Sequence, residues 1–321
     1  MAYEMKTRTG RSFWAVTSAM QNDIRKGDYE VAGYAMWELL PGYTPYLRKR
    51  LLVISAEDCF GILTKDVMSL CEAGDEDSLT RALALLCAAK KNRDADYFVC
   101  NLMIPTDPRG QPSKEEMAHD LHRSIRKMDV VPAGWQSQAL FKKSRKELWK
   151  VLLESTKVYY PRLEDEVEAL RAANDKVSKP SEETIFAAKA IVLIWTYCKR
   201  DTADMVLAHP ILNFSGVVDP ADIIIPKPLE ECERLTGLFP DWAYNWHTYH
   251  GKYDLRRDAV HAITNDQRLL TPLEVNLFDD CSWNRDINAC LEKWNPNRHR
   301  IPYDDGKVQP EVKYGRPGEK E

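Results

Sequence analysis

A basic run with aromatic residues among its cations is the part of this sequence best suited to binding chemistry. Residues 121–157 hold nine lysines and arginines against three acids, although the whole 321-residue chain has a formal net charge of only -4. Cations neutralise phosphates, and aromatic rings can stack on unpaired bases. The pattern therefore predicts a surface for single-stranded nucleic acid. The candidate contact residues are Lys142, Lys143, Arg145, Lys146, Trp149 and Lys150.

The same run also has a purely structural interpretation. Phe141, Leu148 and Leu152 recur at helical spacing, which is typical of a helix that buries one side and leaves its lysines in water. The sequence leaves both interpretations open, and nucleic-acid binding is kept as an alternative function.

Histidines are the next candidates, because two pairs have the spacing of metal ligands. His119 and His122 form one pair, and His247 and His250 form the other. A metal site needs three or four ligands that converge, and neither pair has an obvious third partner nearby. We therefore expect no metal and no cofactor.

Two adjacent acids, Glu57 and Asp58, end an apolar helical stretch. Negative charge near a helix C-terminus opposes the macrodipole, so a local reason for them is expected, either an ion pair with a nearby arginine or a catalytic carboxylate. An enzyme of unrecognised type that uses Glu57, Asp58, His247 and His250 is the second alternative function.

The motifs of the commonest enzymes are missing from the sequence. It has no GxxxxGK[ST] loop to hold a nucleoside triphosphate, and no GxSxG, HExxH or GxGxxG. These patterns place catalytic groups or phosphate-binding backbone amides at fixed positions. We therefore expect a protein without ATPase activity; the wider expectation of a non-catalytic protein comes from the family resemblance described below.

Helices must position all of these residues. Apolar residues at helical spacing, with capping residues before them and Gly or Pro after them, predict helices over 11–26, 28–40, 44–58, 64–71, 77–86 and 94–103. Further helices are expected from the capping boxes at Ser113-x-x-Glu116 and Ser144-x-x-Glu147. Others are expected over 161–174, 181–200, 256–263, 272–281 and 285–294, and extended structure is expected only between 206 and 228.

The predicted fold is therefore all-α, a helical bundle with additional C-terminal helices. A segment rich in Pro and Gly, 104–112, suggests a boundary. We predict a first domain over 9–104, a further helical region over 113–294 and a polar tail over 295–321. Eight scattered cysteines without a CxxC pair, and no apolar run long enough for a membrane span or a signal peptide, predict a cytoplasmic protein that does not associate with membranes.

Several short motifs in the first domain occur in the order found in one known family. They are 18–28 (SAMQNDIRKGD), 34–37 (YAMW), 48–51 (RKRL), 55–58 (SAED) and 90–95 (KKNRDA). Together they resemble the C-terminal domain of MgsA/RarA-type replication-associated AAA+ ATPases, which is similar to the collar of clamp loaders. The matching positions are Gln21, Ile24, Arg25, Asp28, Arg48, Arg50, Glu57, Asp58 and Gly61.

The resemblance covers residues 9–104 and does not include the ATPase module. It differs from the family pattern where 59–61 (CFG) follows the acid pair and where 90–95 stands for a Pro-Lys-Ser-Asn turn. In the family this domain acts as an assembly collar. The resemblance implies a homo-oligomer, a tetramer, that serves as an oligomerisation or adaptor protein for replication or repair proteins or DNA. This assembly role is the leading functional hypothesis from the sequence.

Overall fold

The structure is a computed structural model that describes residues 5–59, 63–89, 91, 94–101, 103, 112–127, 129–159, 161–177, 180–197, 220–239 and 244. Within these residues the regular elements are helices, and β structure is limited to two isolated bridges. The predicted all-α class is therefore confirmed. The α-helices are α1 (Phe13–Lys26), α2 (Tyr29–Leu39), α3 (Thr44–Glu57), α4 (Thr64–Ala73), α5 (Glu76–Ala88), α6 (Asp94–Asn101), α7 (Lys114–Lys127), α8 (Val130–Lys143), α9 (Arg145–Tyr159), α10 (Glu164–Lys176) and α11 (Pro180–Tyr197). The described residues also include three short 3-10 helices, η1 (Pro161–Leu163), η3 (Pro220–Asp222) and η4 (Leu229–Glu231).

The ends of the first helices follow the signals in the sequence. Gly27 ends α1 in the left-handed conformation, with φ of 74°, and its N–H donates to the carbonyl of Ile24 at 3.0 Å. Glycine adopts this conformation without a steric cost, which explains its place after a helix. Asp28 then caps α2 by accepting a 3.2 Å hydrogen bond from the Val31 N–H.

The second half differs from the prediction in one helix. Residues 130–143 form a separate helix, α8, which the sequence analysis did not recognise, and Ser144 separates it from α9. The capping box at Ser113 is confirmed, because Ser113 and Glu116 exchange hydrogen bonds of 2.7 and 3.1 Å. The expected extended run at 223–225 forms no strand, and the helices predicted over 256–294 lie outside the described residues.

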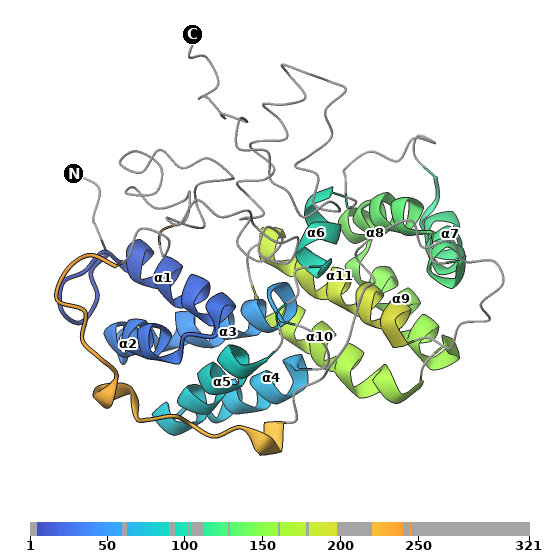
Figure 1. Ribbon diagram of the computed structural model, residues 1–321. Helices are drawn as coiled ribbons and strands as arrows, with labels where there is room; N and C mark the ends of the chain where they lie inside the picture. The colour runs from blue at the N-terminus through green and yellow to red at the C-terminus, as the bar shows by residue number, and fades with distance from the viewer. Residues whose placement is uncertain are drawn as a thin grey trace, which may run out of the picture. The chain divides into compact units, whose positions relative to one another are not determined.

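The chain divides into two compact units. Unit 1 holds residues up to 47, 79–88 and those from 223 onward, whereas unit 2 holds 48–78 and 89–222. Figure 1 shows the helices of both. The predicted domain bounds 9–104, 113–294 and 295–321 remain predictions. No helix in the described part of the chain is both long and apolar enough to cross a bilayer.

Unit 1 is organised around α1, which packs on α2 (Figure 1). Residues 16–25 of α1 are buried on every side, and many of them are polar. One of them is Asp23, whose carboxylate oxygens accept no hydrogen bond from any described residue. Burial, followed by the nearby charge of Asp28, raises the pKa of Asp23 well above its usual range. The buried polar residues are Thr17, Ser18, Gln21, Asn22, Asp23 and Arg25.

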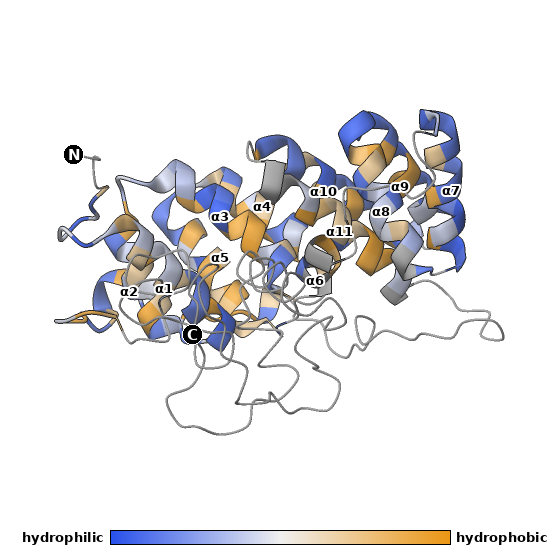
Figure 2. Cartoon of the chain, turned by 90° about the horizontal axis from the view of Figure 1, so that it is seen from above, coloured by the Kyte–Doolittle hydropathy of each residue, from blue (hydrophilic) through white to orange (hydrophobic). Residues whose placement is uncertain are grey.

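Unit 2 is organised around α11, which packs against α6, α9 and α10. Residues 184–195 are buried and mostly apolar. The indole N–H of Trp195 donates to the carbonyl of Ile125 on α7 at 3.0 Å. The ammonium of Lys189 is buried and donates to the carbonyl of Cys59 at 2.6 Å. Figure 2 shows α7 with a hydrophilic side and a narrower hydrophobic one, which carries the buried residues Met117, Leu121 and Ile125.

A buried carboxylate joins α10 to α4 in unit 2. Glu166 accepts hydrogen bonds from the backbone N–H groups of Thr64 and Lys65, at 3.0 and 3.1 Å. These N–H groups begin α4, so Glu166 acts as a cap supplied by a distant helix. Burial raises the pKa of Glu166 to about 7, although the two N–H donors and the charge of Lys189 lower it.

Candidate nucleic-acid interface

A groove runs along α9 and the neighbouring helix α10 in unit 2 and has a volume of about 520 Å³. Its lining is mainly cationic, with five lysines and arginines against two carboxylates. The cations are Arg145, Lys146, Lys150, Lys157 and Arg171. The remaining lining residues are Trp149, Leu153, Glu154 and Asp175.

The sequence of α9 explains why its lysines line the groove. Ser144 precedes the helix and accepts a 3.3 Å hydrogen bond from the Glu147 N–H, which fixes the helix start. The buried residues of α9, among them Leu148 and Leu152, lie on one side, and Lys146, Lys150 and Lys157 are exposed. Lys146 and Lys157 are eleven residues apart, or about 16 Å along the helix.

The groove cations already have partners on the surface. Lys150 pairs with Glu147 at 3.4 Å, and Lys157 pairs with Glu164 at 3.0 Å. The hydrogen bond from Lys157 to Glu164 raises the pKa of Lys157, so this side chain stays charged at neutral pH. Exposed ion pairs of this kind contribute little to stability. These cations can therefore exchange a carboxylate for a phosphate at low cost.

Trp149 has a different position from the lysines. Its side chain is only 4% exposed, and its indole N–H donates to the Asn174 side-chain oxygen of α10 at 2.9 Å. It therefore holds α9 against α10 beneath the cations. Such burial leaves little of the ring open to a base, so it does not favour the stacking role expected from the sequence.

The structure gathers four of the six predicted contact residues, and two lie apart. Lys142 and Lys143 are in the last turn of α8, exposed and outside the groove lining. The ammonium of Lys143 donates to the carbonyl of Pro112 at 2.8 Å. Sequence reasoning missed Lys157 and Arg171 as groove residues. Lys157 continues the helical spacing of α9 and could have been found, whereas Arg171 reaches the groove only through the packing of α10.

The family-motif positions on the first helices have structural contacts. Gln21, Ile24 and Arg25 are buried in α1, and Asp28 caps α2 as described above. Arg48 donates from Nη2 to the carbonyl of Gly74 at 3.0 Å, at the C-terminal end of α4. Gly74 allows this approach, because a Cβ there would lie 1.9 Å from the guanidinium nitrogen.

Three of the remaining motif positions and candidate enzyme residues lie outside the described residues, so the enzyme site expected from the sequence stays a prediction. Arg50 and Glu57 are half-buried and Asp58 is buried, whereas Gly61, His247 and His250 lie outside the described residues. 

The histidines of α7 lie on the surface. His119 is exposed, and the ring of His122 lies 5.7 Å from that of Tyr159. In the part of the chain that the structure describes, no three His, Cys, Asp or Glu side chains are grouped as metal ligands would be.

Comparison of the chain with protein-family models, with curated proteins and with solved structures finds no match. The resemblance to the MgsA/RarA collar domain therefore remains a prediction from the sequence motifs.

Proposed function

We propose that this chain is a non-catalytic binding protein that holds the phosphate backbone of single-stranded nucleic acid in the α9–α10 groove. One observation carries the proposal. Arg145, Lys146 and Lys150, selected from the sequence as phosphate contacts, line one groove together with Lys157 and Arg171. Four of these cations lie on α9 and the packing of α10 adds Arg171, so positive charge is concentrated in one place, as phosphate contacts require.

The groove suits phosphates better than it suits bases. Its cations are on flexible, exposed side chains, and its one aromatic residue, Trp149, is buried. Binding in such a groove depends on charge and not on base sequence, and it weakens steeply as salt rises. Three lysines of α9 in contact with phosphates give a logarithmic salt slope of about 2, because each contact to a single strand contributes about 0.7.

The test is neutralisation of the three α9 lysines, Lys146→Gln, Lys150→Gln and Lys157→Gln, in the full chain. Fluorescence anisotropy with a labelled oligothymidine at several salt concentrations measures the affinity and the salt slope. We expect a loss of affinity of more than tenfold and a slope reduced by about 2.

The matched control removes the same charge elsewhere. Lys26, Lys49 and Lys127 are exposed residues of α1, α3 and α7, and their replacement by glutamine should change the affinity less than threefold. Equal losses in both triple variants would attribute binding to net charge and not to the groove. Salt-insensitive or absent binding by the wild-type chain would overturn the proposal.

The assembly role implied by the collar resemblance, with a replication or repair protein or DNA as partner, remains a separate prediction. Its sharpest demand is a tetramer of four 37.0 kDa chains, which light scattering of the full chain tests at two salt concentrations. A monomer would reduce the resemblance to a likeness of motifs.

A further inference from the structure

A segment from the C-terminal half of the sequence crosses α2 and the residues just before α1 in unit 1. It comprises residues 223–239, includes η4, and contacts α2. Only Leu229, Cys232 and Phe239 of this segment are buried, whereas Ile224 and Leu238 are exposed apolar residues. The segment is therefore held by three side-chain anchors and by polar contacts.

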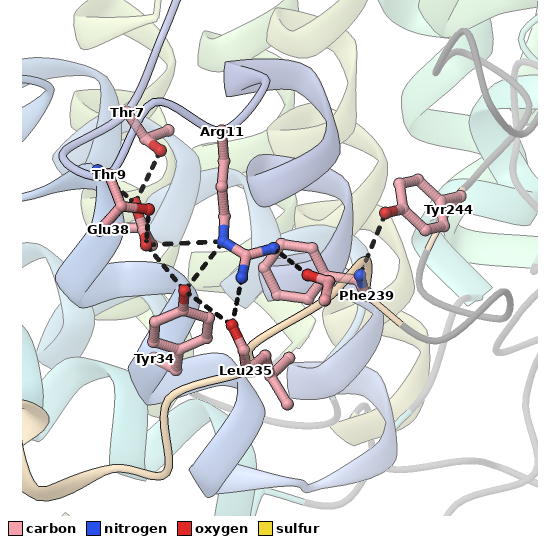
Figure 3. Close-up of polar contacts among 9 residues, drawn as sticks. Thr7, Thr9, Arg11, Tyr34, Glu38, Leu235, Phe239 and Tyr244 are labelled. Carbon is pink, nitrogen blue, oxygen red and sulfur yellow. Dashed lines mark hydrogen bonds and ion pairs between the residues drawn. The ribbon is translucent and has the colours of Figure 1, made fainter.

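One residue, Arg11, just before α1, makes two hydrogen bonds to the segment. Its guanidinium donates to the backbone carbonyls of Leu235 and Gly237 (Figure 3). Two residues of α2 fix the orientation of the Arg11 side chain. Its Nε donates to the Tyr34 hydroxyl at 2.9 Å and lies 3.6 Å from the Glu38 carboxylate. Arg11 is thus fixed in place to bind two carbonyls, those of residues 235 and 237, which are two positions apart in the segment.

Two further residues of α2 also form hydrogen bonds with the backbone of the segment. The Tyr29 hydroxyl donates to the carbonyl of Lys227 at 2.7 Å. The Glu30 carboxylate accepts from the N–H of Glu233 at 3.2 Å and pairs with the Lys227 ammonium. Backbone hydrogen bonds supply affinity that does not depend on side chains, as at sites that bind extended peptides.

A glycine in the middle of α2 makes room for the anchors. A Cβ at Gly33 would lie 2.6 Å from the Cys232 sulfur and 3.5 Å from a methyl carbon of Leu229. Glycine inside a helix costs about 0.5–1 kcal/mol relative to alanine, so its presence here is explained by the space it leaves. The surface therefore has a slot for side chains as well as donors and acceptors for a backbone.

We infer that this surface, formed by α2 and Arg11, is a docking site for an extended peptide, and that the partner it fits is the 223–239 segment of a second copy of this chain. The contacts to carbonyls and N–H groups are the same whichever copy supplies the segment. Residue 222 belongs to unit 2 and residue 223 to unit 1, so the chain passes between units at the start of the segment. Exchange of an identical element at such a point is a low-cost route to a dimer.

The test uses two full-length variants that complement each other. Gly33→Ala blocks the docking surface and keeps a normal segment, whereas Leu229→Ala with Phe239→Ala removes two anchors and keeps a normal surface. In the mixture, the intact segment of the first variant can dock only on the intact surface of the second. We expect native mass spectrometry to detect a species with one copy of each variant, and an excess of free 223–239 peptide to dissociate it at least tenfold.

The matched control separates this association from any other contact between copies. In the control mixture the second variant also carries Gly33→Ala, so no intact surface is present and the mixed species should be absent. Circular dichroism verifies that both variants keep their helices.

Gly42→Ala, where a Cβ meets nothing within 4 Å, should not weaken binding of the peptide to the anchor-deficient chain, whereas Gly33→Ala should weaken it at least tenfold. Mixed species in both mixtures, or in neither, would overturn the inference.

Discussion

Two buried glutamates, one in each unit, hold distant parts of the chain in place and have opposite pKa shifts. Glu38 is 1% exposed and Glu166 is 2% exposed. The pKa of Glu38 is lowered, whereas the pKa of Glu166 is raised to about 7. Glu166 lies deeper in its unit than Glu38 and has fewer donors around it, so burial prevails at Glu166 and hydrogen bonds prevail at Glu38.

Glu38 is surrounded by donors. Burial favours its neutral form, but hydrogen bonds from Thr9, Thr7 and Tyr34 together outweigh that effect, and Arg11 adds a positive charge at 3.6 Å. Thr9 is itself exposed, so the cover over Glu38 is thin (Figure 3). A carboxylate with several donors stays ionised even when little of its surface meets water.

Among the described residues, Glu166 accepts hydrogen bonds from the two backbone donors of α4, in a more deeply buried position. Burial is the largest influence on its pKa, and Lys189 on α11 only partly offsets it, while Asp66 of α4 opposes ionisation. Lys65 is the remaining charged neighbour, and its ammonium pairs with Asp165 at 2.8 Å. The comparison shows that a buried carboxylate gives a unit stability at neutral pH only when enough donors compensate for lost water.

The largest expected effect is a pH dependence of opposite sign at the two glutamates. The folded pKa of Glu166, about 7, lies above the ordinary value of 4.5, so the folded state retains its proton longer and unit 2 loses stability as pH rises from 4.5 to 7. The loss is at most about 3 kcal/mol. The folded pKa of Glu38 is lowered, so its contribution to unit 1 is lost below pH 4.5, as pH falls through that pKa, whereas Asp23 in the same unit has a raised pKa and loses its contribution as pH rises. Hydrogen exchange of α4 and α2, corrected for the intrinsic rate, measures both, and α4 protection that rises with pH would contradict the account.

The next effect concerns the cap on α4. Glu166→Leu keeps the volume but leaves the N–H groups of Thr64 and Lys65 without an acceptor, which should destabilise unit 2 by about 2 kcal/mol and remove its pH dependence between 4.5 and 7. Urea unfolding followed by hydrogen exchange at α4 measures both changes. Glu168→Leu, at a partly exposed residue paired with Arg171, is the control and should change stability by less than about 0.5 kcal/mol.

A smaller effect is expected for the contact between Arg11 and the 223–239 segment. Arg11→Met keeps the apolar stem and removes the donors to the carbonyls of Leu235 and Gly237, so local opening of the segment should become easier by about 1.5 kcal/mol. Limited proteolysis within 223–239 measures that opening. Arg8→Met is the control, because Arg8 donates to Leu40 and lies over Trp37. Equal cleavage of both variants would show that Arg11 has no special role.

The smallest effect is expected from the thin cover over Glu38. Thr9→Val removes one donor, the hydroxyl 2.6 Å from Glu38, while Thr7 and the Thr9 N–H remain. Water can replace the lost hydroxyl at this exposed position, so the loss should be about 1 kcal/mol, together with a higher pKa of Glu38. Carbon-detected NMR titration of the Glu38 carboxyl measures the pKa, and an unchanged value would mean that Thr9 does not hold it down.

The sequence predicted the helices that have local signals. Gly27, Asp28 and the Ser113 capping box act within a few residues of where they stand, so their roles could be inferred without a structure. The α8 helix was missed because its start is not marked by a capping box and Phe141 seemed continuous with the stripe of α9. The roles of Glu166, Gly33 and Arg11 depend on partners more than sixty residues away, and no local pattern indicates them.

The candidate interface was also predicted only in part, because local spacing indicates some of its residues and packing between helices determines the others. Arg145, Lys146 and Lys150 follow one helix, so their shared side could be seen from spacing. Arg171 lies in an acidic stretch of sequence and joins the groove only because α10 packs on α9. The burial of Trp149 could likewise not be predicted from the sequence, since its hydrogen-bond partner Asn174 is on α10.

The most direct test of the proposed function is lysine footprinting of the full chain with and without a single-stranded oligonucleotide. An amine-reactive reagent and mass spectrometry report the accessibility of each lysine separately. The account predicts that Lys146, Lys150 and Lys157 lose reactivity at least fivefold when the oligonucleotide is bound, while Lys26 and Lys49 keep theirs. Uniform protection of all lysines, or protection only outside α9, would contradict the groove as the binding site.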